Sequence, residues 1–227
     1  MTINQILKAL YATYLTNSYG FKLKKVSTKE EKKELRLGYA QTLLDALKIK
    51  VEVINKEKIP QDGKYLLVSN HRSVIDPLII ELATRESKIF GYWVAKKELA
   101  NSFFFGVFVR NAGTILLDRE DAKMGDFFSN IKKCVKDDTS VYIFPEGTRN
   151  KTENDLGEFK EGSKIIALKN RLPILPVYIQ SNANQTLMDS LKDGKQTRVI
   201  KIEIGDMIEY KDRTPLVDNY KKQFHLS

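Results

Sequence analysis

From residue 50 onward, the sequence alternates between short apolar runs and longer stretches in which apolar residues recur at helical spacing. This alternation is typical of an α/β fold, because a sheet that is covered by helices needs both kinds of segment in turn. We expect a mixed sheet of about seven strands flanked by helices. The expected strands are residues 51–54, 65–69, 91–95, 114–117, 141–144, 174–179 and 199–204. The expected helices lie near residues 76–86, 98–109, 120–136, 160–170 and 215–225.

Two amphipathic helices are expected before the first strand. Apolar residues recur at spacings of three and four through residues 3–17, which places them on one face of a helix. Thr28 and Glu31 have the spacing of a capping box and would begin a second helix. We therefore divide the chain into an N-terminal helical unit, residues 1–48, and an α/β domain, residues 49–227.

The N-terminal unit has two possible roles. It could be a helical hairpin that packs on the core of the domain. It could also be an amphipathic anchor that rests on a membrane surface, and the tyrosines of the first helix together with Lys22, Lys24 and Lys25 favour this role.

Composition and charge narrow the classes of function. The chain has 227 residues, 42% of them apolar, and a net charge of +9, which attracts anions such as phosphorylated metabolites and anionic lipid headgroups. Cys134 is the single cysteine, so neither an internal disulfide nor a zinc site is expected. We find no secretory signal and no apolar run of about 18 residues. We expect a peripheral or monotopic protein on the cytoplasmic face of the cell membrane, without a transmembrane helix.

His71 is the candidate general base. The chain has only two histidines, and the other, His225, lies three residues from the end. His71 follows the apolar run 65–68, and Asp76 comes five residues later. If the loop between them folds back, the Asp76 carboxylate would accept a hydrogen bond from one ring nitrogen and leave the other free to take a proton. The alternative is a purely structural loop histidine with Asp76 as a helix cap.

A second polar loop, residues 144–149, follows another apolar run and would meet His71 at the carboxyl edge of the sheet. Gly147 and Thr148 offer N–H and hydroxyl groups to a phosphate, and Arg149 offers a guanidinium. Glu146 would face an arginine or an acceptor hydroxyl rather than the phosphate. Three further candidates for binding an anion are Lys96, Gly113 and Arg119. Taken alone, Arg119 or Arg149 would more often be an ordinary surface residue.

Three further features bear on the chemistry. No Gly-x-Ser-x-Gly nucleophile motif is present, so His71 would activate an acceptor hydroxyl or water directly. Residues 102–109 are the most apolar stretch and would form a core helix, line a groove for an alkyl chain or enter the membrane interface. Residues 147–160 form the longest expected loop and could act as a flap over the site.

Four blocks of the sequence together resemble the glycerophospholipid acyltransferases, and in particular the bacterial lysophosphatidic acid acyltransferases. Residues 70–76 resemble the NHxxxxD block of that family, and residues 113–119 its glycine–strand–arginine block. Residues 144–149 match the FPEGTR block throughout, and residues 172–177 are similar to the VPIVPV block, with leucine in place of two of its valines. The blocks occur in order across about half of the chain.

The resemblance implies acyl transfer from an acyl carrier protein or coenzyme A thioester to the sn-2 hydroxyl of 1-acyl-glycerol-3-phosphate, which yields phosphatidic acid. It implies catalysis by His71 and Asp76, and no cofactor is expected. Glycerol-3-phosphate or another lysolipid could replace this acceptor, and water could replace it in a thioester hydrolase. A non-catalytic basic membrane-binding module is the alternative from another class. Nucleic acid is disfavoured as a partner, because the basic residues are dispersed along the chain.

Overall fold

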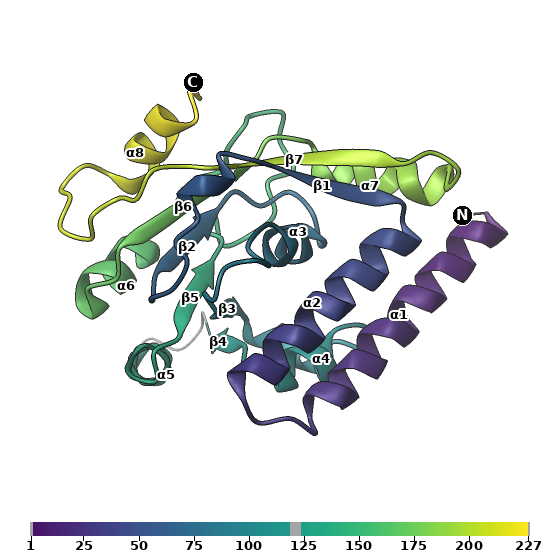
Figure 1. Ribbon diagram of the computed structural model, residues 1–227, viewed down its shortest axis with the longest axis horizontal. Helices are drawn as coiled ribbons and strands as arrows, with labels where there is room; N and C mark the ends of the chain where they lie inside the picture. Colours follow the sequence, from purple (N-terminus) through teal and green to yellow (C-terminus); the bar gives the residue numbers. More distant parts are fainter. Residues whose placement is uncertain (1, 119–123, 227) are drawn as a thin grey trace.

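The computed structural model describes residues 2–118 and 124–226, and a seven-stranded sheet lies at its centre (Figure 1). The strand order is β1-β7-β6-β2-β5-β3-β4. The strands are β1 (Ile49–Ile54), β2 (Leu66–Ser69), β3 (Gly91–Lys96), β4 (Ile115–Leu117), β5 (Ser140–Ile143), β6 (Ile174–Ile179) and β7 (Arg198–Ile204). All seven predicted strands are therefore confirmed, with ends that shift by no more than two residues.

The sheet is mixed, as expected, because β6 and β7 pair in antiparallel fashion while every other neighbouring pair is parallel. β2 lies between β5 and β6, with Leu66 opposite both Val141 and Ile174. The carboxyl ends of β2, β3, β4, β5 and β6 consequently lie along one edge of the sheet. In an open α/β sheet this edge is where ligands bind.

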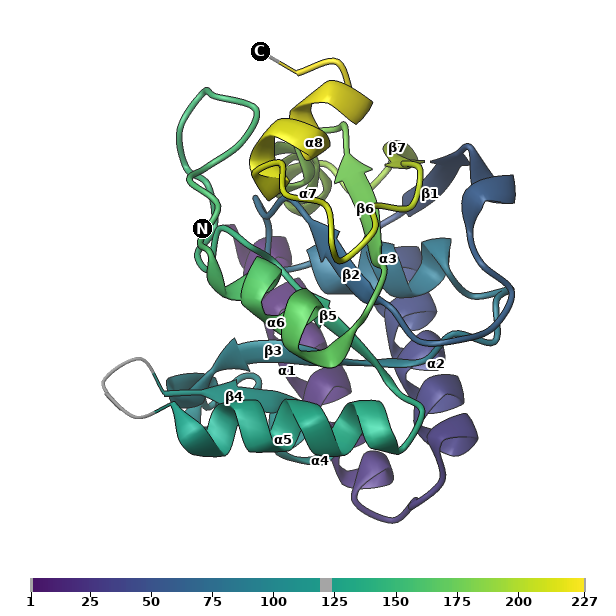
Figure 2. The same ribbon diagram turned by 90° about the vertical axis from the view of Figure 1, so that its left-hand side faces the viewer.

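Helices cover both faces of the sheet. Figure 2 shows α5 (Gly125–Lys136) and α6 (Gly162–Asn170) on the near side, with α1 (Ile3–Leu23) and α2 (Lys29–Ala46) on the far side. Successive residues of a strand point to opposite faces. Leu67 accordingly packs in a core with α2 and α3, whereas Leu66 and Val68 pack in a second core with α5, α6 and α8. Burial on both faces explains why the central strands read as continuous apolar runs. The helices around the sheet are α3 (Asp76–Ala83), α4 (Gly106–Asn111), α5 (Gly125–Lys136), α6 (Gly162–Asn170), α7 (Ala183–Lys192) and α8 (Leu216–Gln223).

The N-terminal hairpin consists of α1 (Ile3–Leu23) and α2 (Lys29–Ala46). Thr28 caps α2 in the predicted capping box with Glu31, and α1 runs six residues past its expected end at residue 17. α2 lies between α1 and the sheet (Figure 1), and its Tyr39 and Leu44 belong to the same apolar core as the strands. The boundary after residue 48 therefore crosses a shared core. In the described part of the chain, every helix is too short or too polar to cross a bilayer.

The helix expected at residues 98–109 is wrong as a continuous element. A 3₁₀ turn, Lys97–Asn101, is followed by a bend and then by α4. Ser102 has extended backbone angles, and its Oγ accepts hydrogen bonds from the N–H groups of Phe104 and Phe105. Such serine–backbone bonds compete with helix formation. The bend leaves Phe103 81% exposed.

The sequence analysis missed α7, although its signals were present. Asn182 caps the helix by accepting a hydrogen bond from the Gln185 N–H, and Ala183 and Leu187 are buried at a spacing of four. The helix expected to begin at residue 120 begins at Gly125 within the described residues, because residues 119–123 lie outside them.

Candidate active site

The site begins where β2 ends, at Asn70. The Asn70 side chain copies the hydrogen bonding of a strand residue: its Oδ1 accepts from the Ile179 N–H at 2.8 Å, and its Nδ2 donates to the Ile179 carbonyl at 3.1 Å. The Asn70 N–H donates to Tyr220 Oη at 3.2 Å, and that hydroxyl donates to the Val177 carbonyl at 2.5 Å. These bonds fix the backbone directly before His71 to the middle of the sheet.

The predicted hydrogen bond between His71 and Asp76 is present, with 2.8 Å between His71 Nδ1 and Asp76 Oδ2. The same oxygen accepts from the backbone N–H groups of Arg72 and Ser73, each at 2.7 Å. These two bonds are what fold the loop back, because they wrap residues 72 and 73 around the carboxylate at the start of α3. Asp76 is fully buried, whereas the His71 side chain keeps 18% of its surface exposed. The arrangement leaves Nε2 as the ring nitrogen that can take a proton.

The backbone of His71 is held from the second loop. Its N–H donates to Glu146 Oε1 at 2.7 Å, and its carbonyl accepts from the Asn150 N–H at 2.6 Å. Glu146 Oε2 accepts from the Gly157 N–H at 2.8 Å. The sequence analysis expected Glu146 to face an arginine or an acceptor hydroxyl, but both of its oxygens bind backbone N–H groups. Glu146 thus fastens three loop segments together.

An aromatic stack supports the imidazole ring of His71. The ring lies parallel to Phe144, with 4.0 Å between centroids and 9° between planes. Phe144 also stacks on Trp93 of β3, at 4.9 Å and 22°. The sequence analysis treated Phe144 only as the end of an apolar run and gave Trp93 no role. Neither contact has a sequence signal, because the three rings come from three different segments.

Gly147, Thr148, Arg149 and Lys96 lie around the same edge of the sheet. Gly147 has a φ of +65°, which glycine adopts without strain, and it leads to the exposed residues Thr148 and Arg149. Lys96 is the last residue of β3 and is partly buried. Arg119 lies outside the described residues.

Gly113 lies in the turn before β4 with a φ of +79°. A Cβ atom at this position would lie 2.1 Å from the Tyr92 ring. The structure therefore gives Gly113 a conformational role: it allows a tight turn against an aromatic ring.

Arg72 holds the loop that follows the FPEGTR block. Its guanidinium donates to the carbonyl of Thr152 at 3.1 Å and to that of Asn154. Further along, residues 153–156 line a hollow of about 420 Å³ together with Lys221 of α8. Figure 2 shows this loop projecting beside α8. The loop expected at 147–160 is therefore tied to His71's neighbour.

Burial governs the titration of two groups. It raises the pKa of the Glu146 carboxyl, while the hydrogen bonds from the N–H groups of His71 and Gly157 act in the opposite direction. Burial also raises the pKa of the Cys134 thiol to about 11. A thiol with this pKa is protonated near neutrality and is a poor nucleophile. Within the described residues, no cluster of His, Cys, Asp and Glu side chains has the size needed to hold a metal ion.

Together these features define an α/β protein with a His–Asp pair and a polar, arginine-bearing loop at the carboxyl edge of its sheet. A family model described as Acyltransferase matches residues 50–180. The chain belongs to this acyltransferase family.

Individual relatives within the family share one name. The chain is 37% identical over 156 residues to the 1-acyl-sn-glycerol-3-phosphate acyltransferase of Helicobacter pylori, an alignment that covers 66% of this chain and 64% of that protein. It is 36% identical over 124 residues to the enzyme of the same name from Streptococcus pneumoniae, covering 54% of this chain and 44% of that one. The matched region thus spans less than two thirds of either relative.

The fold also matches a solved structure. The crystal structure of the 1-acyl-sn-glycerophosphate (LPA) acyltransferase PlsC from Thermotoga maritima superposes with a TM-score of 0.70, and the alignment covers 98% of this chain and 92% of that one. The two sequences are 20% identical. The likeness confirms the expected fold class, including the helical hairpin ahead of the sheet.

Proposed function

We propose that the protein transfers a fatty acyl group from an acyl thioester to the sn-2 hydroxyl of 1-acyl-glycerol-3-phosphate, making phosphatidic acid. The observation that carries the proposal is the His71–Asp76 hydrogen bond of 2.8 Å at the carboxyl end of β2, joined through Glu146 to the FPEGTR block. The names of the Helicobacter pylori and Streptococcus pneumoniae relatives support the choice of acceptor.

His71 acts as the general base. Its Nε2 takes the proton of the acceptor hydroxyl as the oxygen attacks the thioester carbonyl carbon. The tetrahedral intermediate then collapses, the carbon–sulfur bond breaks and the thiolate recovers the proton from the imidazolium. Asp76 holds the imidazole by Nδ1 and stabilises its charged form, because its carboxylate is buried against the ring. The acceptor attacks directly, so no covalent acyl-enzyme is needed.

The phosphate of the acceptor binds the loop after β5. Thr148 and Arg149 are exposed there, and Gly147, whose N–H donates to the Phe144 carbonyl at 2.9 Å, forms the turn that leads to them. Lys96 at the end of β3 adds a positive charge on the neighbouring strand. Arg119 completes the set in the proposal, although it lies outside the described residues.

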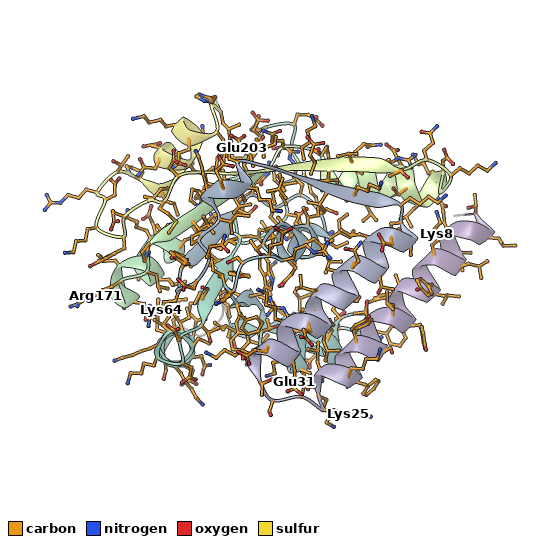
Figure 3. All side chains as sticks on the ribbon, in the orientation of Figure 1. Lys8, Lys25, Glu31, Lys64, Arg171 and Glu203 are labelled. Carbon is orange, nitrogen blue, oxygen red and sulfur yellow. The ribbon has the colours of Figure 1, made fainter. Side chains whose placement is uncertain are left out.

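The protein rests on the cytoplasmic face of an anionic membrane through α1. The outer face of α1 exposes apolar and aromatic side chains, whereas the outer face of a helix in water normally carries polar ones. The exposed side chains are Ile3, Ile6, Leu7, Leu10, Tyr11, Tyr14 and Phe21. An apolar groove of about 210 Å³ lies between α1 and α2. Figure 3 labels Lys25 at the turn of the hairpin, where a basic residue would meet lipid headgroups. The same figure shows Lys64 and Arg171 on the opposite side.

The donor is an acyl carrier protein or coenzyme A thioester. Both donors are anionic, so the net charge of +9 would speed their encounter with the enzyme at low salt.

The test is a competition assay with the purified full chain in phosphatidylglycerol vesicles. Lysophosphatidic acid and glycerol-3-phosphate are supplied together with acyl carrier protein and coenzyme A thioesters, and the products are identified by mass spectrometry. Phosphatidic acid should form, and His71→Ala should abolish it while leaving the circular dichroism spectrum unchanged. Formation of acylated glycerol-3-phosphate would move the assignment to a different acceptor. Free fatty acid formed in the absence of acceptor would indicate a hydrolase. An active His71→Ala enzyme would show that His71 is not the general base.

A further inference from the structure

The imidazole of His71 is held on its edge and on its face, and both supports lead back to one buried carboxylate. Asp76 binds the edge and begins α3, and Glu81 lies about one and a half turns further along that helix. Phe144 covers the face and stacks in turn on Trp93, whose indole Nε1–H donates to Glu81 Oε1 at 2.9 Å. The contacts form a closed circuit that begins and ends at His71.

The N-terminal hairpin supplies the charge that balances this carboxylate. Arg36 of α2 forms an ion pair with Glu81 Oε1, the same oxygen that accepts from Trp93. Its other guanidinium nitrogen donates to the Gly91 carbonyl of β3 at 2.7 Å. The side chains of Arg36 and Glu81 are only 3% and 8% exposed. A carboxylate this deeply buried is tolerated only when it is paired and hydrogen-bonded.

We infer that Arg36, Glu81 and Trp93 are positioning residues that hold the ring of His71 in its reactive orientation, and that α2 is consequently part of the active-site scaffold. The inference rests on the proposed role of His71 as the base. Proton abstraction requires the base to stand within hydrogen-bond reach of the acceptor hydroxyl, and small displacements lower the rate steeply. Trp93 keeps Phe144 in place, and Glu81 keeps both Trp93 and the start of α3 in place.

The experiment reads His71 directly. The chain has two histidines, so a His225→Ala background leaves a single imidazole in the proton NMR spectrum of the full chain in detergent micelles. A ring stacked on Phe144 experiences its ring current, which shifts the His71 ring protons upfield. Loss of fold stability alone would not move these resonances, whereas a displaced Phe144 would.

Two substitutions of Trp93 separate the stack from the hydrogen bond. Trp93→Leu removes both, and we expect kcat to fall about tenfold to 100-fold, with the KM for lysophosphatidic acid unchanged within about twofold. The His71 resonances should lose their upfield shift. Trp93→Phe retains a stacking ring but no donor, so kcat and the upfield shift should fall below those of wild type but less than in Trp93→Leu. It also remains informative if the leucine variant does not fold.

A comparison of one single variant with the double variant tests the charge pair. Arg36→Gln leaves the Glu81 carboxylate buried without its partner, and should lower kcat and shift the His71 resonances. The double variant Arg36→Gln/Glu81→Gln removes both charges and retains a carbonyl oxygen for Trp93, so it should recover at least half of the lost log kcat. The matched control is Lys56→Gln/Glu86→Gln, an ion pair whose side chains are 51% and 67% exposed, which should change neither readout.

The outcomes separate this inference from the proposed function. Unchanged His71 resonances and unchanged kcat in folded Trp93→Leu would overturn the inference and leave the base role standing. Moved resonances together with an active His71→Ala enzyme would uphold the positioning network but overturn the base role. A control pair that moves the resonances as much as Arg36→Gln would also overturn the inference.

Discussion

The carbonyl oxygen of His71 accepts a hydrogen bond from the backbone N–H of Asn150 at 2.6 Å. The His71 N–H donates to Glu146, which lies four positions before Asn150 in the second loop. The loop after β5 therefore spans the backbone of the candidate base on both sides. Because β2 and β5 are neighbouring parallel strands, the two loops leave the sheet together and behave as one bonded unit.

Replacing Asp76 with asparagine should separate charge from structure. A carboxamide oxygen at the position of Oδ2 can still accept from His71, Arg72 and Ser73, and Oδ1 has no partner among the described residues. Asp76→Asn should keep its fold and lose about 10²- to 10⁴-fold in kcat, because the imidazolium loses its counter-charge. Stopped-flow or steady-state thiol release measures this. Asp126→Asn, in the exposed first turn of α5, is the control.

Glu146 should make stability depend on pH. Its pKa is raised above the ordinary value of 4.5 in the folded state, so the folded protein holds this proton more tightly than the unfolded chain. Its contribution to the free energy of unfolding is complete below pH 4.5 and is lost as pH rises through the folded pKa. Urea unfolding of wild type and Glu146→Gln between pH 4 and 8 should therefore show the wild type's relative stability declining with pH. Parallel curves for the two proteins would contradict this.

Gly113 should tolerate no side chain. Alanine there must adopt a φ of +79° and place its Cβ 2.1 Å from the Tyr92 ring. Gly113→Ala should lower the free energy of unfolding by at least about 2 kcal/mol in denaturant melts. The matched control is Gly162→Ala at the start of α6, where a Cβ meets nothing within 4 Å. That variant should be neutral or more stable by up to about 1 kcal/mol.

The outer face of α1 should carry membrane binding. Leu10 and Tyr14 are 62% and 69% exposed, and Leu10→Ser/Tyr14→Ser removes apolar surface without entering the core. Flotation with phosphatidylglycerol vesicles should show at least about a tenfold weaker association of the variant. Added salt should weaken the association of both the variant and the wild type with the vesicles. Leu168→Ser on α6, which is 55% exposed, should bind like wild type. Deleting the hairpin would be a poorer test, because α2 shares the core of the sheet.

The Cys134 thiol should be unreactive toward alkylating reagents in the folded protein. A thiol pKa of about 11 leaves on the order of one thiolate per thousand molecules at pH 8. Labelling of the native protein by iodoacetamide should be slow and should accelerate with each unit of pH up to that value, whereas the unfolded protein should react rapidly at pH 8. Cys134→Ala should retain full activity. Rapid labelling at pH 7 would show that the thiol is not protected.

Much of the fold could be predicted because its strands are buried on both faces. A strand such as β6, with all six residues buried, leaves a continuous apolar run that a short window detects. The capping box at Thr28 and the fold-back of Asp76 toward His71 are also local, since their partners lie within five residues.

The parts of the site that could not be predicted depend on distant partners. Glu146 contacts a backbone N–H 75 residues away, and Arg36 meets Glu81 across 45 residues. Such contacts depend on strand order, which an apolar pattern does not encode. The break after residue 101 was missed for a different reason: the apolar spacing of residues 98–109 is compatible with a helix, and a single serine hydroxyl decides against it.

The paired bonds between Asn70 and Ile179 have a consequence for how this chain can change. The Asn70 side chain makes the two hydrogen bonds to Ile179 that a main-chain residue of β2 would otherwise make. β2 can therefore end at Ser69 while Asn70 stays attached to β6. Inserting or deleting one residue between β2 and His71 would break these hydrogen bonds and carry the imidazole to the other face of the sheet. We therefore expect the distance along the chain from β2 to His71 to be fixed in any functional variant.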